Sequence, residues 1–177
     1  YNFTCNAASS LNKRAGLFGQ IDGPSAEIKN LTLVNPIINT PGASAVGALV
    51  GVFSDGRILN CHVVGGSVHG SGVVGGLAGG CDDTVEKCSS TADVTGGSRV
   101  GGLVGIAYDG SIIKSCVRGG IVTANEKVGG LAGGAENVIT DSYSLAQVNG
   151  TGSFVGGLVG YLNCYGAAHR CYAAGFV

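Results

Sequence analysis

Apolar residues in this 177-residue chain come in short runs that are interrupted by glycine and polar residues, and the runs recur along the chain. The clearest recurring phrase is Val-Gly-Gly-Leu-x-Gly, present in six full or altered copies. Their central residues are Leu17, Leu49, Leu77, Leu103, Leu131 and Leu158. These leucines are 32, 28, 26, 28 and 27 residues apart, which is a period typical of stacked structural repeats. We therefore predict one repeat architecture for residues 15–177, with residues 1–14 as a partial repeat.

A second apolar phrase lies between the leucines and keeps phase with them. Its copies run from Ile28 to Leu31, Ile58 to Cys61, Val85 to Cys88, Ile113 to Cys116, Ile139 to Ser142 and Ala168 to Cys171. A valine usually follows about six residues later, as Val94 follows Cys88. Each repeat thus holds three short apolar segments separated by Gly, Asn, Asp and Ser, and this punctuation is typical of strands and tight turns.

The spacing of apolar residues excludes helices almost everywhere, since interior glycines would each cost a helix about 1 kcal/mol. The repeat is too short for a propeller blade and lacks the helix of a leucine-rich repeat. The pattern predicts an all-β, single-domain β-solenoid over residues 1–177, with about six rungs of 26–32 residues. Equivalent residues of stacked strands lie about 4.8 Å apart, so the six leucines should form a core ladder.

The phrase Val-Gly-Gly-Leu-Val-Gly followed by Ile-x-x-Cys resembles the GLUG repeat family, named for its Gly-Leu-x-Gly core. The resemblance covers roughly residues 15–177. It implies a β-solenoid of secreted or surface proteins with no known catalytic residues. The first and last copies depart from the family pattern, through an insertion around Pro36 and Pro41 and through the apolar-poor segment 166–169.

The seven cysteines bear on the cellular compartment. Cys61, Cys88 and Cys116 are expected in one column, as small apolar residues of the core, because Leu31 and Ser142 take the same position.

Two cysteine pairs repeat one spacing, Cys81 with Cys88 and Cys164 with Cys171. Each pair is a disulfide candidate, the second more than the first, and Cys5 is a further candidate that could join neighbouring molecules. A disulfide would place the protein outside a reducing cytosol, and an odd count leaves one thiol free or intermolecular.

Three Asn-x-Ser/Thr sequons point weakly in the same direction, with Asn2, Asn30 and Asn149 as glycosylation candidates. We therefore expect an extracellular or cell-surface location. The chain begins with Tyr1, which suggests a removed leader.

Charge and hydropathy exclude two classes of partner. Ten basic and eleven acidic residues give a net charge of −1, and the scattered lysines and arginines offer no basic stripe for phosphates. No apolar run is long enough to span a membrane. We expect neither nucleic acid binding nor a membrane span.

The search for chemistry finds no catalytic, cofactor-binding or metal site. Residues 70–75 match a dinucleotide-binding fingerprint, but no helix pattern follows. His62 follows Cys61 directly, so on a strand the two point to opposite faces, and a metal site through His62 and His69 is a weak alternative. Aspartates such as Asp55 and Asp109 precede glycines and favour turns. No carboxylate cluster supports a polysaccharide-cleaving enzyme.

The sequence therefore favours a non-enzymatic extracellular structural protein without cofactors, a β-solenoid subunit that stacks head to tail into a filament, sheath or surface layer. Residues 1–5 begin in the phase of residues 167–171, so the end rungs are open and should pair with those of another copy. The alternative is a spacer or adhesive binding module of a larger surface protein, with a glycan or a host protein as partner.

Overall fold

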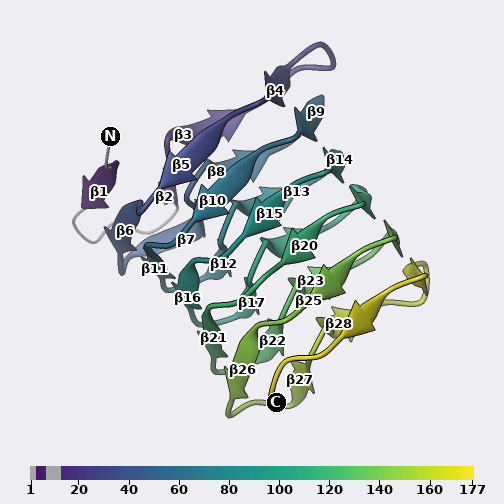
Figure 1. The fold of residues 1–177 in the computed structure, drawn as a ribbon. Coiled ribbons are helices and arrows are strands. Elements are labelled where there is room, and N and C mark those ends of the chain that lie inside the picture. The colour runs from purple at the N-terminus through teal and green to yellow at the C-terminus, as the bar shows by residue number, and fades with distance from the viewer. Residues whose placement is uncertain (1–2, 7–12) are drawn as a thin grey trace.

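The computed structural model describes residues 3–6 and 13–177, and in these residues the chain is a stack of coils made of short parallel strands (Figure 1). Each coil, here called a rung, contributes one strand to each of five sheets, and each sheet has six strands. All strand pairs are parallel, as in β1 with β6. The predicted all-β solenoid of about six rungs is confirmed.

The strands of each sheet come from successive rungs. The first sheet holds β1 (Thr4–Asn6), β6 (Ile37–Thr40), β11 (Ser67–Gly70), β16 (Asp93–Thr95), β21 (Ile121–Ala124) and β26 (Gln147–Gly150). The second sheet holds β2 (Lys13–Ala15), β7 (Ala43–Gly47), β12 (Val73–Gly75), β17 (Arg99–Gly101), β22 (Lys127–Gly129) and β27 (Phe154–Gly156). The third sheet holds β3 (Phe18–Ile21), β8 (Val50–Phe53), β13 (Ala78–Cys81), β18 (Val104–Ala107), β23 (Ala132–Ala135) and β28 (Val159–Leu162).

The last two sheets complete each rung. The fourth sheet holds β4 (Glu27–Lys29), β9 (Arg57–Leu59), β14 (Thr84–Glu86), β19 (Ile112–Ile113), β24 (Val138–Thr140) and β29 (Ala167–His169). The fifth sheet holds β5 (Thr32–Val34), β10 (His62–Val64), β15 (Ser89–Ser90), β20 (Cys116–Val117), β25 (Tyr143–Ser144) and β30 (Tyr172–Ala173).

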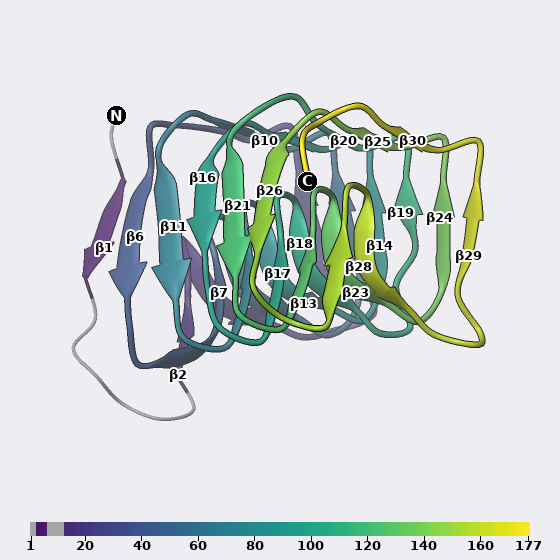
Figure 2. The ribbon, with the colours of Figure 1, turned by 90° about the horizontal axis from the view of Figure 1, so that it is seen from below.

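Equivalent residues of successive rungs stand in register, so that every strand position becomes a column along the stack. In the second sheet one such column holds Val46, Val74, Val100, Val128 and Val155. Figure 2 shows the same stacking for the first sheet, whose strands β1, β6, β11, β16, β21 and β26 lie side by side. Columns of aliphatic side chains fill the narrow interior.

The six predicted leucines stand at the bend between the second and third sheets. Four of them are at most 1% exposed, namely Leu49, Leu77, Leu103 and Leu131. Their backbones also form a ladder, in which Leu77 N donates to Leu103 O at 2.8 Å. Leu17 is 37% exposed and Leu158 is only partly buried, because both belong to the outermost rungs, where a neighbouring rung covers one side only.

Each rung has five strands, although the sequence pattern suggested three apolar segments. The leucine phrase spans two strands with a bend between them. The second phrase spans one strand of the fourth sheet and one of the fifth, joined by a residue in the left-handed region. That residue has φ between 49° and 58° in every rung, at Asn30, Asn60, Lys87, Lys114, Asp141 and Arg170.

From the second rung onward, the residue after each left-handed turn belongs to a column of thiols and hydroxyls, whereas the first rung has Leu31 at this position. Cys61 N donates to Cys88 Sγ at 3.4 Å, Cys88 N to Ser115 Oγ at 3.0 Å, and Ser115 N to Ser142 Oγ at 3.1 Å. The prediction that Cys116 belongs to this column is wrong, because Ser115 follows the left-handed turn at Lys114. Cys116 instead pairs in register with Ser89. The column therefore satisfies backbone N–H groups as well as filling space.

Candidate functional site: a groove between the second and third sheets

The second and third sheets approach each other so closely that only glycine fits at their corner. A Cβ on Gly79 would lie 2.5 Å from Gly51 O and 2.6 Å from Val46 N, and one on Gly105 would lie 2.6 Å from Gly79 O. Real Cβ atoms do not come so near to backbone atoms. The last glycine of the repeated phrase is thus required by the packing of the two sheets.

Beyond this corner the outward side chains of the two sheets line a hollow of about 310 Å³, here called the corner groove. Its floor is apolar and partly made of small residues, including Ala45, Val73 and Gly80. A Cβ on Gly80 would meet only Val52 Cγ2, at 3.7 Å, so the space above Gly80 belongs to the groove. The groove residues are Arg14, Ser44, Ala45, Val52, Ser54, Val73, Gly80, Asp82, Ile106 and Tyr108.

Polar and aromatic groups stand along the groove walls. Tyr108 is 40% exposed, and Arg14 donates to the side chain of Gln20. Burial raises the pKa of the Asp82 carboxyl, repulsion from Asp109 raises it further, and the positive charge of Arg14 opposes both. Asp82 and Arg14 therefore interact across the groove, which presents an anion, a cation and an aromatic ring over an apolar floor.

The same two walls carry cations and aromatic rings farther along the stack. Lys127 Nζ lies 4.5 Å from the ring centroid of Tyr161 and 5.5 Å from that of Phe154, within cation–π range. The two rings meet edge to face at 5.4 Å. Arg99 stands one rung earlier, in register with Lys127, and its buried Nε atom has no hydrogen-bond partner.

The cysteines proposed for disulfides are all within the described residues, and each is a free thiol. Cys164 is exposed, Cys171 and Cys5 are half-buried, and Cys81 and Cys88 are buried. Burial raises the pKa of the Cys81 thiol to about 12, although a hydrogen bond to Asp83 O opposes this shift. A thiol that stays protonated at neutral pH is a poor nucleophile in disulfide exchange.

Of the glycosylation candidates, Asn30 and Asn149 are exposed and Asn2 lies outside the described residues. Asn30 accepts a hydrogen bond from Asn60 Nδ2 at 2.8 Å, and Asn149 Oδ1 accepts one from Gln147 Nε2 at 3.3 Å.

Within residues 3–6 and 13–177, no group of three or more His, Cys, Asp or Glu residues is placed to hold a metal ion. His62 and His69 lie on different sheets, the fifth and the first. Cys61 directly precedes β10 and is buried in the core, whereas His62, the first residue of β10, is half-buried. In the same part of the chain, no helix is long and apolar enough to cross a membrane.

The corner groove could not be predicted from the sequence, because its residues come from four different rungs. The register between rungs is the signal that finds it. Residues that follow the last glycine of each repeated phrase line one wall, and residues that precede the phrase line the other. Arg14 and Tyr108, for example, are far apart in sequence and share one cavity only through the stacking.

The fold defines a β-solenoid protein with an external groove. The chain is similar to the immunoglobulin A1 protease of Streptococcus sanguinis, with 31% identity over 156 residues, in a match that covers 78% of this chain and 8% of that protein. It is also similar to halomucin of Haloquadratum walsbyi, with 34% identity over 95 residues, which are 54% of this chain and 1% of that protein. No family model matches the chain.

A crystal structure shows the same architecture. It belongs to a Bacteroides ovatus protein provisionally described as an immunoglobulin A1 protease, and it superposes with a TM-score of 0.78 at 25% identity. The match covers 97% of this chain and 56% of the other. The chain is thus related to IgA1 protease-like proteins with a β-solenoid fold, and it spans less than a tenth of the curated relatives it matches.

These similarities overturn the prediction of a non-enzymatic protein, because two of the similar proteins are named as proteases. The prediction relied on the lack of catalytic clusters in the repeats. That argument does not extend to proteins of which the repeats are a small part.

Proposed function

We propose that the chain is a β-solenoid segment of a secreted or cell-surface protein of the IgA1 protease-like kind, and that its corner groove binds a glycan chain. The names of the relatives, a mucin and a protease of an immunoglobulin, support an extracellular setting. The resemblance of this chain's own Val-Gly-Gly-Leu-x-Gly repeats to the GLUG repeat family supports the same setting.

The observation that carries the proposal is the composition of the corner groove. A sugar ring has apolar faces and a rim of hydroxyl groups, so it needs an aromatic or aliphatic surface next to hydrogen-bonding groups. Tyr108 and Val73 supply the apolar surface, while Arg14, Ser54 and Asp82 supply donors and acceptors. The lining residues of the groove come from four successive rungs, which suits a chain of sugars better than a small isolated molecule.

A glycan array followed by calorimetric titration of the best ligand tests this proposal. Tyr108→Ala should weaken binding by about tenfold, because it removes the contact between one aromatic ring and the bound sugar. Gly80→Leu should abolish binding by filling the groove. Tyr165→Ala is the matched control, since Tyr165 is 82% exposed and outside the groove. If Tyr108→Ala and Gly80→Leu bind glycan as well as Tyr165→Ala does, the groove is not the site.

Head-to-tail self-association is a second candidate, favoured by the apolar residues that the last rung exposes. Leu162 occupies an inward column position yet is 40% exposed, and Phe176 is 83% exposed. A second copy stacked on this rung would bury both and continue the ladder. Sedimentation over a concentration series should then show growing oligomers that Leu162→Asp prevents. Monomers at every concentration would contradict stacking.

A further inference from the structure

The outer face of the fifth sheet carries a chain of four hydrogen-bonded side chains that is separate from the corner groove. Asn60 Nδ2 donates to Asn30 Oδ1 at 2.8 Å. His62 Nε2 lies 3.1 Å from Asn60 Oδ1, and His62 Nδ1 lies 2.9 Å from Ser89 Oγ. Four residues from three successive rungs thus form one continuous relay.

The relay selects one tautomer of His62. Because the amide nitrogen of Asn60 is engaged by Asn30, its oxygen faces His62 and accepts the proton of Nε2. The other ring nitrogen, Nδ1, then has a free lone pair directed at Ser89 Oγ. A hydroxyl that donates to a neutral imidazole, which is held in turn by a third group, is the arrangement of an activated nucleophile.

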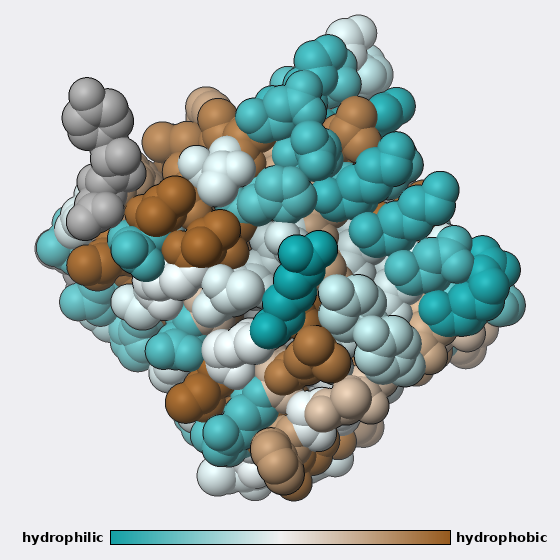
Figure 3. Space-filling view, in the orientation of Figure 1, coloured by the Kyte–Doolittle hydropathy of each residue, from teal (hydrophilic) through white to brown (hydrophobic). Residues whose placement is uncertain are grey.

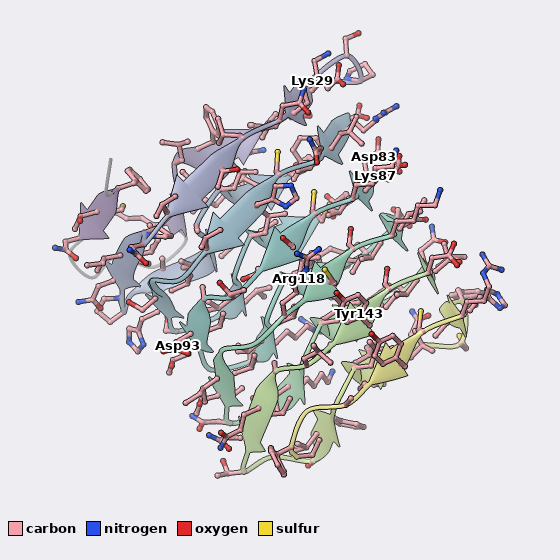
Figure 4. The ribbon with its side chains drawn as sticks, in the orientation of Figure 1. Lys29, Asp83, Lys87, Asp93, Arg118 and Tyr143 are labelled. Atoms are coloured by element: carbon pink, nitrogen blue, oxygen red, sulfur yellow. The ribbon has the colours of Figure 1, made fainter. Side chains whose placement is uncertain are left out.

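The register of the fifth sheet places a cation one rung away from Ser89. His62, Ser89 and Cys116 stand opposite one another on β10, β15 and β20. Arg118 Nε donates to Cys116 Sγ at 3.3 Å, and Arg118 and Tyr143 point outward from this face (Figure 4). The space-filling view shows polar side chains over this part of the face (Figure 3).

We propose that Ser89 is a nucleophile that takes acyl groups from esters, with His62 as general base and Asn60 as the residue that positions His62. The Ser89 Oγ proton passes to His62 Nδ1 while Oγ bonds to the acyl carbon. The ester C–O bond breaks, and the leaving alcohol oxygen takes the proton back from His62. Water, deprotonated by His62, then cleaves the acyl-serine and restores the hydroxyl.

The substrate class follows from what surrounds Ser89. The backbone N–H groups there are used by the sheet: Ser89 N donates to Cys61 O at 3.1 Å and Thr91 N to Val63 O at 2.9 Å. Neither of these two backbone donors is free to stabilise an oxyanion, and losing such a donor costs about 100- to 1,000-fold in rate. Arg118 follows β20, the strand paired with that of Ser89, and supplies a positive charge to this face in the next rung. We therefore infer activity on acyl esters, such as O-acetyl groups, rather than on peptide bonds.

The test uses p-nitrophenyl acetate and a fluorophosphonate probe on the whole chain, with peptide mapping to locate the adduct. The adduct should form at Ser89. In His62→Gln the rate of labelling should be about 100-fold lower, because that is the usual contribution of a general base. Ser71 is the internal control: it is exposed, and its hydroxyl donates to Ala43 O at 3.1 Å. Labelling of Ser71 as fast as Ser89 would overturn the proposal.

Asn60 requires a separate variant pair, because it has φ 52°. Asn60→Gly tolerates this conformation and removes only the amide, so labelling of Ser89 should fall about tenfold. Asn60→Asp keeps an acceptor for His62 Nε2, so the labelling of Ser89 in this variant should be close to that of the unaltered chain. Thermal unfolding of both variants reports on the fold. Equal labelling of Ser89 in both variants would show that Asn60 does not position His62, and no adduct on Ser89 in the unaltered chain would refute the nucleophile.

Discussion

Single residues matter most in the column of thiols and hydroxyls behind the left-handed turns. Ser115 Oγ accepts from Cys88 N at 3.0 Å and donates to Ile113 O at 2.9 Å. Ser115→Ala leaves the buried Cys88 N–H without a partner and should lower the free energy of unfolding by about 1–3 kcal/mol. Ser115→Cys, which repeats the residue of the preceding rung, is the control. Urea titration should give Ser115→Cys a free energy of unfolding close to that of the unaltered chain. An alanine variant that is as stable as the cysteine variant would contradict this role of Ser115.

The left-handed turn at Lys114 predicts the order of stability of variants at this position. Lys114 has φ 49°, a conformation that costs ordinary residues about 1–2 kcal/mol and asparagine less. Lys114→Asn should therefore be slightly more stable than the unaltered chain, while Lys114→Val should be less stable, because a branched Cβ crowds the backbone there. Thermal denaturation of the three proteins measures the order, and a valine variant as stable as the asparagine variant would contradict it.

At the same scale, the sequence allowed some positions to be predicted and not others. Leu77 and Leu103 could be placed in the core because a strict repeat forces equivalent residues into equivalent places. Cys116 was assigned to the wrong column, since a shift of one residue is invisible in the sequence when cysteine and serine are interchangeable. His62 and Ser89 could not be paired, because their contact depends on the register between rungs.

Among the elements, the third sheet has two adjacent glycines on β13, Gly79 and Gly80, and its packing requires glycine only at Gly79. Gly79→Ala would force a Cβ against the backbone of Gly51 and Val46, so it should destabilise the chain by about 3 kcal/mol. Gly80→Ala adds the same atom to the corner groove, where the nearest contact is an ordinary 3.7 Å, and should change stability by less than about 0.5 kcal/mol. Chemical denaturation of the pair gives a direct comparison. Similar losses in the two variants would mean that the corner packing is not what requires glycine.

The number of strands in a rung could not be predicted from the pattern of apolar residues. The leucine phrase and the second phrase each looked like one apolar segment. Each is two strands, because the chain bends at the glycines before Leu103 and at the left-handed Lys114. Bends of this kind leave the apolar pattern unbroken, so the number of strands could not be predicted although the period could.

For the whole molecule, the protection of backbone amides against hydrogen exchange should decrease from the middle of the stack to its last rung. A rung is held by its neighbours on both sides, as in other solenoids. All residues of β18 are buried, whereas those of β28 are partly or fully exposed. Hydrogen exchange should therefore be slowest for β18 and fast for β28. Uniform exchange along the stack would indicate a single cooperative unit instead.

The register of the columns also has a genetic consequence. Gly75 pairs with Gly101, so deleting residues 76–101 joins Gly75 to Gly102, a residue of the same type and phase as Gly76. The product should keep the fold and lose one rung. Unequal recombination between repeats can thus lengthen or shorten such a protein by whole rungs, and the corner groove changes its length along a ligand in equal steps.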